Sequence, residues 1–276
     1  MTLLYKLYKL IVILVINLLF LLLGIVITAL SLLIKNSIKL KALCSMLWAR
    51  TNCKMLGLRV SIDGSYRDSQ YGFTVCNHVS YLDIFALGSI RPSVFVSKHE
   101  VKGWPLLGWL ALIAGTIFID RKSKKTTLTA LAEMEQMIKQ NINIVLFPEG
   151  TTSDGYVLRE FKSPLFDLPA KTRIPVIPVS LRYRGIDSHP INTKSEMDII
   201  AWYGDMKLLP HVWDVLGHKQ IDLTLFFNPV INELITGPEA TGARKLLSSL
   251  SYESIKHGLT EIEAVGVSQR NSSGFV

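Results

Sequence analysis

An uncharged, strongly apolar stretch near the N-terminus constrains this chain more than any other feature of its sequence. From Leu10 to Ile34, a run of 25 residues contains no charged side chain. As one helix rising about 1.5 Å per residue, the run would extend roughly 37 Å, enough to cross the hydrocarbon core of a bilayer. The mean hydropathy of +0.32 is high for a wholly soluble protein, and this segment accounts for much of the excess. We therefore expect the chain to be attached to a membrane.

A cleavable signal peptide is the alternative explanation of this stretch. The apolar part of a signal peptide is usually only about 7–15 residues long and precedes a cleavage site of small residues. Here the run is longer and is followed by Lys35, Lys39 and Lys41, which indicates a retained anchor. The heavier basic flank is C-terminal, so the globular part is expected on the cytoplasmic side. Gly24 would also allow a bent, half-inserted hairpin, and both arrangements stay open.

Composition narrows the classes of partner. The chain has 276 residues, a formal net charge of +8 and a pI near 9.3, which suits either nucleic acid or an anionic membrane. We find no zinc-finger spacing and no arginine-rich arm, so we expect membrane lipids and no nucleic acid as partners. The three cysteines form no Cys-x-x-Cys motif, which fits a reducing compartment without a disulfide framework.

After the apolar run, short apolar segments alternate with helical patterns. Strands are predicted at 58–62, 73–76, 93–97, 116–119, 142–147, 176–182 and 221–227, and helices at 36–57, 80–88, 104–114, 126–140, 206–216 and 242–261. This alternation predicts an α/β domain with a mixed, largely parallel sheet flanked by helices and preceded by the membrane-anchoring helix. The expected divisions are 1–57 for the anchor and a basic juxtamembrane helix, 58–262 for the catalytic domain, and 263–276 for a flexible polar tail.

The segment "CNHVSYLD" contains the first candidate catalytic pair. His78 ends a predicted strand, where side chains of open α/β sheets face the usual ligand crevice. Asp83 has a structural explanation, because Ser80 and Asp83 have the spacing of a capping box. With His78 in the loop and Asp83 in the first helical turn, the two side chains can also meet, and the aspartate would then fix the imidazole tautomer. We expect Ser80 to cap the helix and Asp83 to turn to the imidazole.

Three further segments follow in order: "GTIFIDR", "FPEGTTS" and "IPVIPV". The first ends a predicted strand with a cation, the second places Glu149 in a turn rich in hydroxyls and amides, and the two prolines of the third suit an edge or irregular strand. Together with "NHVSYLD", these blocks resemble the four motifs of the glycerolipid acyltransferases, the group of lysophosphatidate acyltransferases. The resemblance covers roughly Leu58 to Tyr183.

The resemblance implies transfer of a fatty acyl group from a thioester, on coenzyme A or acyl carrier protein, to the free hydroxyl of a lysolipid. In that scheme His78 is the general base and Asp83 its partner, without a metal or another cofactor. Histidine suits this task because an alcohol is a poor nucleophile and must lose its proton as it attacks. The acceptor would be held by a set of residues from the later motifs and their neighbours: Arg121, Glu149, Gly150, Thr151, Thr152 and Lys98. The supporting positions would be Asn77, Ser80 and Gly115.

One position departs from the family pattern. Many members that acylate lysophosphatidate have arginine where this chain has Thr152, and "FPEGTTSDG" looks more like members that acylate other lysolipids. Lys98, Arg159 and Lys162 are possible sources of replacement charge. The expected acceptor is 1-acylglycerol-3-phosphate, giving phosphatidic acid in phospholipid biosynthesis, with lyso-ornithine lipid or another lysophospholipid as the alternative.

Two other classes of function stay open at this point. If residues 75–78 are extended, Cys76 and His78 share a face, and such a pair would make a thioesterase or lipid hydrolase. A buried cysteine is also a common small hydrophobic residue. A non-catalytic membrane-binding protein on the same fold is the other alternative, which the intact set of His78, Asp83, Arg121 and Glu149 disfavours.

Overall fold

The fold is built on one mixed eight-stranded sheet. The structure, a computed structural model, describes residues 2–30, 37–67, 71–104, 107–119, 124–172, 174–232 and 240–272. The strand order is β1-β8-β6-β2-β5-β3-β4, with β7 paired to β6. The strands are β1 Leu58–Gly64, β2 Phe73–Cys76, β3 Ser93–Lys98, β4 Ile117–Ile119, β5 Asn143–Leu146, β6 Val176–Ile186, β7 His189–Pro190 and β8 Ile221–Phe227.

Most strand pairs are parallel, as the alternation of strands and helices predicted. The pairs β1–β8, β2–β5, β2–β6, β3–β4 and β3–β5 are parallel, whereas β6 pairs with β8 and β7 in the antiparallel sense. All seven predicted strands are present, and those at 73–76 and 221–227 have the predicted bounds. The two-residue β7 was not predicted, because it is too short to show an alternating pattern.

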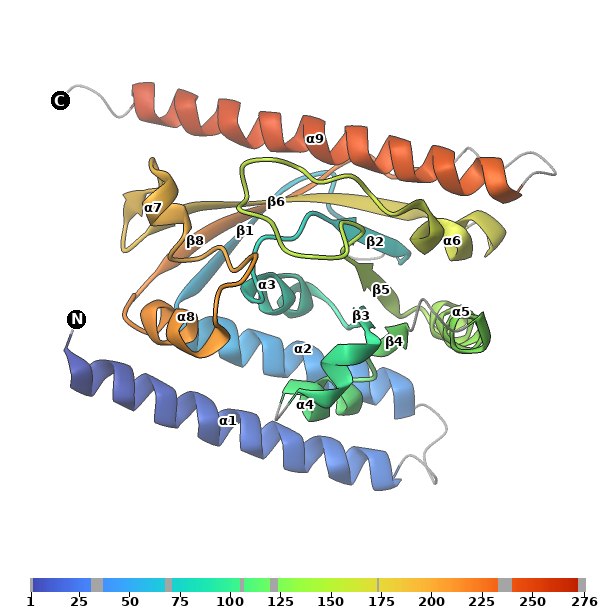
Figure 1. Cartoon of the computed structure of the whole chain (residues 1–276), viewed down its shortest axis with the longest axis horizontal. Coiled ribbons are helices and arrows are strands. Elements are labelled where there is room, and N and C mark those ends of the chain that lie inside the picture. The colour runs from blue at the N-terminus through green and yellow to red at the C-terminus, as the bar shows by residue number, and fades with distance from the viewer. Residues whose placement is uncertain are drawn as a thin grey trace.

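Helices cover both faces of the sheet. Figure 1 shows α9 crossing one face at the top of the view, while α2, α3, α4 and α8 lie on the opposite side and α1 lies outermost. The α-helices are α1 Leu3–Leu30, α2 Ser37–Leu56, α3 Leu82–Ile90, α4 Leu107–Ile113, α5 Lys124–Lys139, α6 Asp167–Thr172, α7 Lys194–Met197, α8 Leu208–Val215 and α9 Ala240–Ser272. Two 3₁₀ turns, η1 His99–Gly103 and η2 Ser163–Phe166, complete the set.

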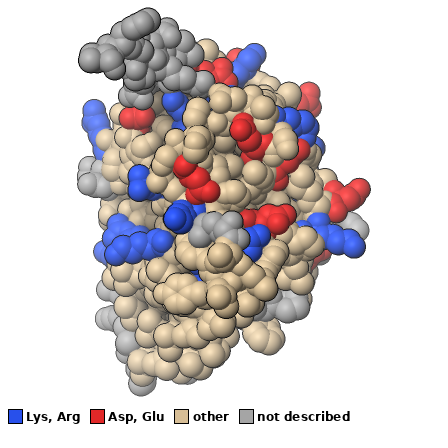
Figure 2. All heavy atoms as spheres, turned by 90° about the vertical axis from the view of Figure 1, so that its left-hand side faces the viewer, with Lys and Arg blue, Asp and Glu red and all other residues tan. Residues whose placement is uncertain are grey.

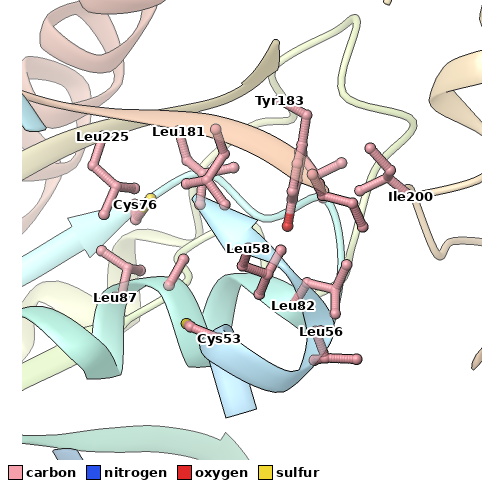
Figure 3. Packing of buried hydrophobic residues seen from close by; sticks show 14 of the residues in the cluster. Cys53, Leu56, Leu58, Cys76, Leu82, Leu87, Leu181, Tyr183, Ile200 and Leu225 are labelled. Carbon is pink, nitrogen blue, oxygen red and sulfur yellow. The ribbon is translucent and has the colours of Figure 1, made fainter. Parts of the chain in front are cut away.

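Alternation along β6 divides the core between the two faces. Ile177, Val179 and Leu181 belong to the cluster under α2, α3 and α8, which Figure 3 shows in part. Val176 belongs instead to a second cluster, which contains residues of α5, α6 and α9. Ser180 points to the α9 side as well, where its Oγ donates to the carbonyl of Ile255 at 2.8 Å. This is the period-2 pattern of a strand buried on both faces.

Pro175 precedes β6 and Pro178 lies within it, so of the two predicted alternatives the edge strand was wrong, whereas the irregular strand agrees with the shifted ladder to β8. β6 has β2 on one side and β8 on the other. The antiparallel ladder with β8 begins only at Val179, opposite Phe227, and the Pro178 carbonyl accepts from Asn228 N just before it. In a strand, the N–H and the carbonyl of one residue point to the same side, which for Pro178 is the side of β8. The missing N–H therefore falls at the end of the β6–β8 ladder, where no strand hydrogen bond is lost.

The expected boundary at residue 57 does not separate an independent module. α2 packs along α3, and its Cys53 and Leu56 belong to the main core cluster. α1 is tied to the domain as well, because Lys9 Nζ donates to the carbonyls of His218 at 2.7 Å and Leu56 at 3.4 Å. The two N-terminal helices are therefore part of the catalytic domain's packing.

Polar contacts also join α1 to α2. The Asn17 side chain accepts from Trp48 Nε1 at 2.8 Å and donates to Asn52 Oδ1 at 3.4 Å. Asn17 is buried, as is Gly24, where an added side chain would run into Ile113 of α4. Lys9 and Asn17 of the apolar helix thus face the protein and not its surroundings.

The polar tail expected from residue 263 begins inside a helix. α9 continues without a break to Ser272, and residues 273–276 lie outside the described part of the chain. Glutamate, glutamine and arginine are good helix formers, so a polar composition by itself does not end a helix that is already nucleated.

Gly258→Ala is expected to destabilise the packing of α9 on the sheet by about 1–3 kcal/mol. A Cβ at residue 258 would collide with Asn228 Oδ1 and Ser180 Oγ. Asn228 Nδ2 bonds Ser180 Oγ at 2.9 Å, so the pair cannot move apart without losing a buried hydrogen bond. Urea unfolding of the detergent-solubilised protein measures the effect.

Gly242→Ala is the matched control on the same helix. No heavy atom lies within 4 Å of the added Cβ, so alanine should stabilise the protein by up to about 1 kcal/mol through helix propensity alone. Equal effects of the two substitutions would contradict the close packing of α9.

Candidate functional site

The candidate site lies where β2 ends and its chain turns into α3. Residues 77–81 form the connecting loop, at the carboxyl end of a strand with parallel neighbours on both sides. β5 ends beside it and leads into the turn that begins at Phe147. The first and third sequence motifs are therefore brought together at one edge of the sheet, as expected for a ligand crevice in an open α/β sheet.

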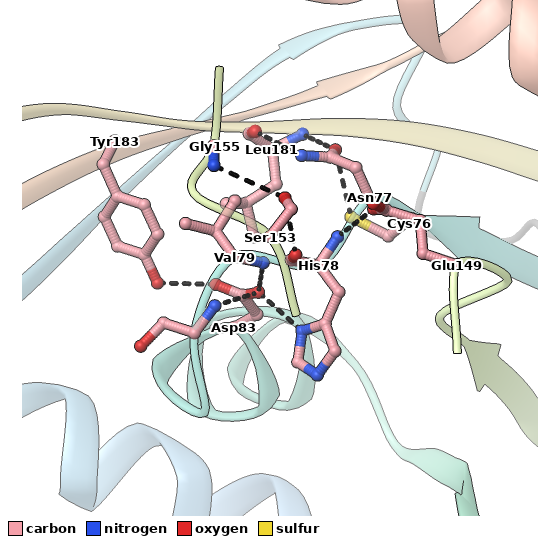
Figure 4. A network of polar contacts seen from close by, with 11 residues as sticks. Cys76, Asn77, His78, Val79, Asp83, Glu149, Ser153, Gly155, Leu181 and Tyr183 are labelled. Atoms are coloured by element: carbon pink, nitrogen blue, oxygen red, sulfur yellow. Dashed lines mark hydrogen bonds and ion pairs between the residues drawn. The ribbon is translucent and has the colours of Figure 1, made fainter. Parts of the chain in front are cut away.

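His78 and Asp83 are in direct contact. His78 Nδ1 lies 2.8 Å from Asp83 Oδ2, and the aspartate is completely buried while the histidine side chain is 15% exposed. A carboxylate is an acceptor only, so Nδ1 carries the proton and Nε2 keeps its lone pair. Figure 4 shows this second ring nitrogen pointing away from Asp83. The arrangement suits a general base.

The Asp83 carboxylate also accepts backbone hydrogen bonds from the loop. Oδ2 lies 2.7 Å from Val79 N and 3.0 Å from Ser80 N, and Oδ1 accepts from the Tyr183 hydroxyl at 2.6 Å (Figure 4). Four donors thus converge on one carboxylate. It organises the loop and contacts the imidazole at the same time.

The expectation that Ser80 caps the helix was wrong. α3 begins at Leu82 with Tyr81 at its N-cap and no side-chain capping bond, and Ser80 Oγ is buried without a hydrogen-bond partner among the described residues. The Asp83 side chain instead reaches back and accepts from the amides of Val79 and Ser80, which precede the helix. The same carboxylate therefore holds the loop and contacts the histidine.

Asn77 joins the catalytic loop to β6. Its Nδ2 donates to the Leu181 carbonyl at 2.9 Å, and its Oδ1 accepts from Leu181 N at 2.8 Å. The side chain thereby continues the β2–β6 ladder one step beyond Cys76. On the other side, Ser153 donates to the His78 carbonyl from its backbone N at 2.8 Å and from its Oγ at 3.1 Å. The loop that carries the histidine is held from both sides.

Glu149 faces inward and holds the same loop. One carboxylate oxygen accepts from His78 N at 2.7 Å and the other from Arg159 N at 3.2 Å, and the side chain is buried. Burial raises the pKa of the Glu149 carboxyl to about 7, the two N–H donors oppose this rise, and the charge of Asp83 adds to it. The structure thus gives Glu149 a contact with the catalytic loop, and its predicted contact with the acceptor stays a prediction.

The turn after β5 supplies a platform for the imidazole. The ring of Phe147 stacks on that of His78, with centroids 3.8 Å apart and planes 10° apart. Gly150 follows with φ of 70°, a left-handed conformation that favours glycine. Gly150 N and Ser153 N are engaged with Phe147 and His78 carbonyls, so the amides of Thr151 and Thr152 are the candidates for an oxyanion.

Of the remaining predicted site residues, Thr151, Thr152 and Lys98 lie at this edge, whereas Gly115 precedes β4 and lies at the opposite, amino-terminal edge of the parallel strands. Thr151 is exposed and Thr152 is buried, and Lys98 is exposed at the end of β3. Gly115, with φ of 79°, ends the turn between α4 and β4. Arg121 lies outside the residues that the structure describes, so its predicted role stays a prediction.

Cys76 does not join the site. Its side chain is fully buried in the main core cluster and contacts Asn77 Oδ1 at 3.8 Å (Figure 3). Burial raises the pKa of the Cys76 thiol well above its usual range, and the charges of Asp83 and Glu149 act in the same direction. A thiol in this state is a poor nucleophile, which removes the basis for a cysteine hydrolase.

Sequence reasoning missed three residues of the site: Phe147, Ser153 and Tyr183. The first two belong to the "FPEGTTS" segment, but nothing in the sequence says that one stacks on the histidine and the other binds its carbonyl. Tyr183 lies 100 residues from Asp83, at the end of an apolar strand pattern, which is a position typical of a core residue.

Among the residues that the structure describes, no cluster of three or more His, Cys, Asp or Glu side chains is placed to hold a metal ion.

Comparison with known proteins adds independent information. A family model described as Acyltransferase matches residues 58–182. A lyso-ornithine lipid O-acyltransferase of Rhizobium meliloti is 34% identical over 192 residues, covering 67% of this chain and 65% of that protein. One of Pseudomonas aeruginosa is 40% identical over 137 residues, covering 50% and 52%. A 1-acyl-sn-glycerol-3-phosphate acyltransferase of Neisseria meningitidis is 33% identical over 151 residues, covering 55% and 56%. The chain thus spans less than two thirds of the length of each of these relatives.

A solved structure resembles this fold over nearly its full length. The crystal structure of the 1-acyl-sn-glycerophosphate (LPA) acyltransferase PlsC from Thermotoga maritima has a TM-score of 0.60 and 20% sequence identity. The similarity covers 93% of this chain and 98% of that one. It indicates a common fold that includes the N-terminal helices.

Glu149→Gln is expected to remove a pH dependence of stability. The folded-state pKa of about 7 lies above the ordinary value of 4.5, so the native state holds the proton more tightly than the unfolded state. The resulting stabilisation is complete below pH 4.5 and is lost as the pH rises through 7. Between pH 5 and pH 8 the unaltered protein should lose about 2–3 kcal/mol more unfolding free energy than the variant.

Urea unfolding at the two pH values measures this difference. Glu253→Gln, which changes an exposed glutamate on α9, should follow the unaltered protein. If stability of the Glu149→Gln variant fell with pH in parallel with both, Glu149 would not be the buried titrating group.

Proposed function

Because the chain belongs to the glycerolipid acyltransferase family, we propose that it transfers a fatty acyl group from a thioester donor to the free hydroxyl of a lysolipid. The observation that carries the proposal is the His78–Asp83 contact, in which Nδ1 is engaged at 2.8 Å and Nε2 is left as a base. The four motif blocks and the acyltransferase match over residues 58–182 support the same reaction class.

The residues of the site have distinct tasks in this reaction. His78 Nε2 takes the proton of the acceptor hydroxyl as its oxygen attacks the thioester carbonyl. Asp83 stabilises the imidazolium that results. In this proposal the amides of Thr151 and Thr152 donate to the tetrahedral oxyanion. When the C–S bond breaks, the imidazolium returns its proton to the leaving thiolate, and the enzyme is restored without a cofactor.

The donor in this proposal is acyl-CoA or acyl carrier protein. Both present the acyl group as a thioester on the same phosphopantetheine arm, so the chemistry at the carbonyl is identical. Two features of the site fit such a donor: a general base at the sheet edge and a turn rich in amides beside it. Neither feature separates the two carriers.

We propose lyso-ornithine lipid as the acceptor, with 1-acylglycerol-3-phosphate as the second candidate. Thr152 stands where many lysophosphatidate-acylating members have arginine, and its side chain is buried, so this position offers no cation to a phosphate. The lyso-ornithine lipid acyltransferases among the relatives favour the first candidate. Arg121 and the exposed Lys98 favour the second, since both can pair with a phosphate.

We propose that α1 holds the enzyme at the membrane. Its length and composition would allow it to span a bilayer. Its outward face exposes many large apolar side chains: Leu3, Leu4, Leu7, Tyr8, Ile11, Leu14, Val15, Leu18, Leu19, Leu22, Leu23, Ile25, Val26 and Leu30. Figure 2 shows that the lower part of the molecule, where α1 lies, carries few charged side chains on this face. An exposed apolar surface of this extent fits contact with lipid.

The contacts of α1 favour insertion into one leaflet over a full span. The helix packs along α2 and α4, and the Lys9 and Asn17 bonds attach it to the domain. A helix crossing the bilayer in this arrangement would draw the domain into the hydrocarbon core. Lying in the membrane surface, it buries its apolar face and leaves the catalytic edge beside the lipid. The cytoplasmic side remains part of the proposal, supported by the basic residues that follow the helix.

Acyl transfer from one labelled acyl-CoA to a panel of lysolipids tests the function. The panel contains lyso-ornithine lipid, lysophosphatidate and lysophosphatidylcholine, and we expect the first to be the best acceptor. His78→Ala should lower kcat by about 10²–10⁴-fold, because the alcohol loses its base. His257→Ala, which changes an exposed histidine on α9, should leave kcat unchanged. Transfer by a folded His78→Ala variant at the original rate would exclude the general-base role.

Changing the outward face of α1 tests the membrane proposal. Leu18→Gln combined with Leu22→Gln replaces two exposed leucines, and the loss of their burial in lipid should weaken binding to phosphatidylcholine vesicles by about a hundredfold. Flotation of the purified protein with vesicles measures this binding. Leu246→Gln on α9, at the opposite face of the molecule, should have no effect. Unchanged flotation of the double variant would place the membrane contact elsewhere.

A further inference from the structure

We infer that Tyr183 is a positioning residue for the catalytic pair: its hydroxyl fixes the Asp83 carboxylate and, through it, the His78 imidazole. The inference rests on the proposed acyl transfer, in which His78 is the base. It concerns a residue beyond the "IPVIPV" block, on a strand that supplies no other side chain to the His78–Asp83 pair.

The contact is short and fully enclosed. The Tyr183 hydroxyl donates to Asp83 Oδ1 at 2.6 Å, and the side chains are 2% and 0% exposed. Figure 3 shows the ring among the core side chains, where Leu82 and Ile200 belong to the same cluster. Its hydroxyl is the ring's single polar atom, and it ends at the carboxylate (Figure 4). Water therefore cannot take the place of the hydroxyl.

The second carboxylate oxygen depends on this hydroxyl. Oδ2 is held by His78 Nδ1 and by the amides of Val79 and Ser80, whereas Tyr183 is the donor to Oδ1. A buried anionic oxygen without a donor is costly, and the cheapest relief is rotation of the carboxylate about its χ2 bond. Rotation would move Oδ2 away from Nδ1. The tyrosine therefore keeps the carboxylate plane in the orientation that the histidine needs.

The backbone path of β6 explains why the Tyr183 side chain reaches Asp83. Pairing of β6 with β2 ends at Val179, and Asn77 extends the attachment to Leu181. Tyr183 is two residues further on and lies on the same face as Leu181. The ladder between β6 and β8 shifts register between Tyr183 and Gly185, and such irregularities re-aim side chains next to active sites. The strand thus overhangs the loop that carries His78.

A structural role alone predicts a different outcome from a positioning role. Every buried tyrosine hydroxyl needs a partner, so its loss lowers stability wherever it lies. A positioning role predicts in addition that kcat falls while KM for both substrates is preserved, since Tyr183 touches Asp83 and the core but not the open side of the imidazole. It also predicts that the effect depends on the Asp83 carboxylate.

Tyr183→Phe is the direct test. We expect kcat to fall roughly tenfold with unchanged KM, because a hydrogen bond to a charged group is lost and each factor of ten in rate corresponds to about 1.4 kcal/mol. Tyr203→Phe is the matched control, since it removes a half-buried hydroxyl that donates to another carboxylate, Asp198 Oδ1, at 3.0 Å and outside the site. The control should lose stability without the fall in kcat. Equal kcat for Tyr183→Phe and the unaltered protein would overturn the inference.

A double-mutant cycle shows whether Tyr183 acts through Asp83. If it does, adding Tyr183→Phe to Asp83→Asn should lower kcat by less than twofold beyond the effect of Asp83→Asn alone. A full tenfold further loss in that background would assign Tyr183 an independent role and overturn the inference. Circular dichroism and thermal unfolding of each variant confirm that the compared proteins are folded.

A third measurement does not depend on acyl transfer. The proton on His78 Nδ1, hydrogen-bonded to a carboxylate, gives a downfield ¹H NMR signal, assigned by its loss in His78→Gln. In Tyr183→Phe this proton should exchange faster with water, whereas in Tyr203→Phe it should not. An unchanged exchange rate would overturn the inference even if every enzyme assay were negative. Absence of transfer to any acceptor by the unaltered protein, with the NMR effect present, would instead overturn the proposed function and leave the role of Tyr183 standing.

Discussion

Four hydrogen bonds converge on the carboxylate of Asp83, and the geometry of the site depends on them. Two come from loop amides, one from the imidazole and one from a tyrosine on a strand of the same sheet. Three of the donors belong to the loop after β2 and the fourth to β6, so the carboxylate, itself at the start of α3, joins these three elements. A single buried charge is stabilised by many donors and in return orders their backbone. This is why a side chain in the first turn of a helix can define a catalytic base.

A second carboxyl group lies near this charge. Glu149 approaches the same loop from the turn after β5 and takes the amide of His78, and its pKa is raised to about 7 by burial. At neutral pH this group is therefore divided between its charged and uncharged forms, which lessens the repulsion between two buried acids. The third motif thus contacts the first twice, through the Glu149 carboxylate and through the ring of Phe147, which stacks on the imidazole.

Local patterns were enough to predict the sheet and the contact between His78 and Asp83. The apolar runs at 73–76 and 221–227 have turn residues at both ends, and the strands found there have the predicted bounds. The spacing of His78 and Asp83 was sufficient because a loop followed by one helical turn can bring them together in few ways. Contacts set by tertiary packing could not be predicted: the capping-box spacing of Ser80 and Asp83 does not show that Ser80 Oγ is buried without a partner while Asp83 binds the loop amides. Tyr183 and the inward contacts of Lys9 and Asn17 depend likewise on elements remote in the sequence.

Asn77 has a mechanical consequence for how substrates must arrive. Its side chain makes the two hydrogen bonds that a backbone strand would make, so the loop at 77–81 is attached to β6 as part of the sheet. The loop therefore cannot open and close as a lid does, because each opening would break two buried hydrogen bonds and expose their partners. The base is therefore preset before either substrate is present. In the proposed reaction, the adjustment during turnover would therefore fall to the lysolipid, whose hydroxyl would have to reach a fixed nitrogen atom.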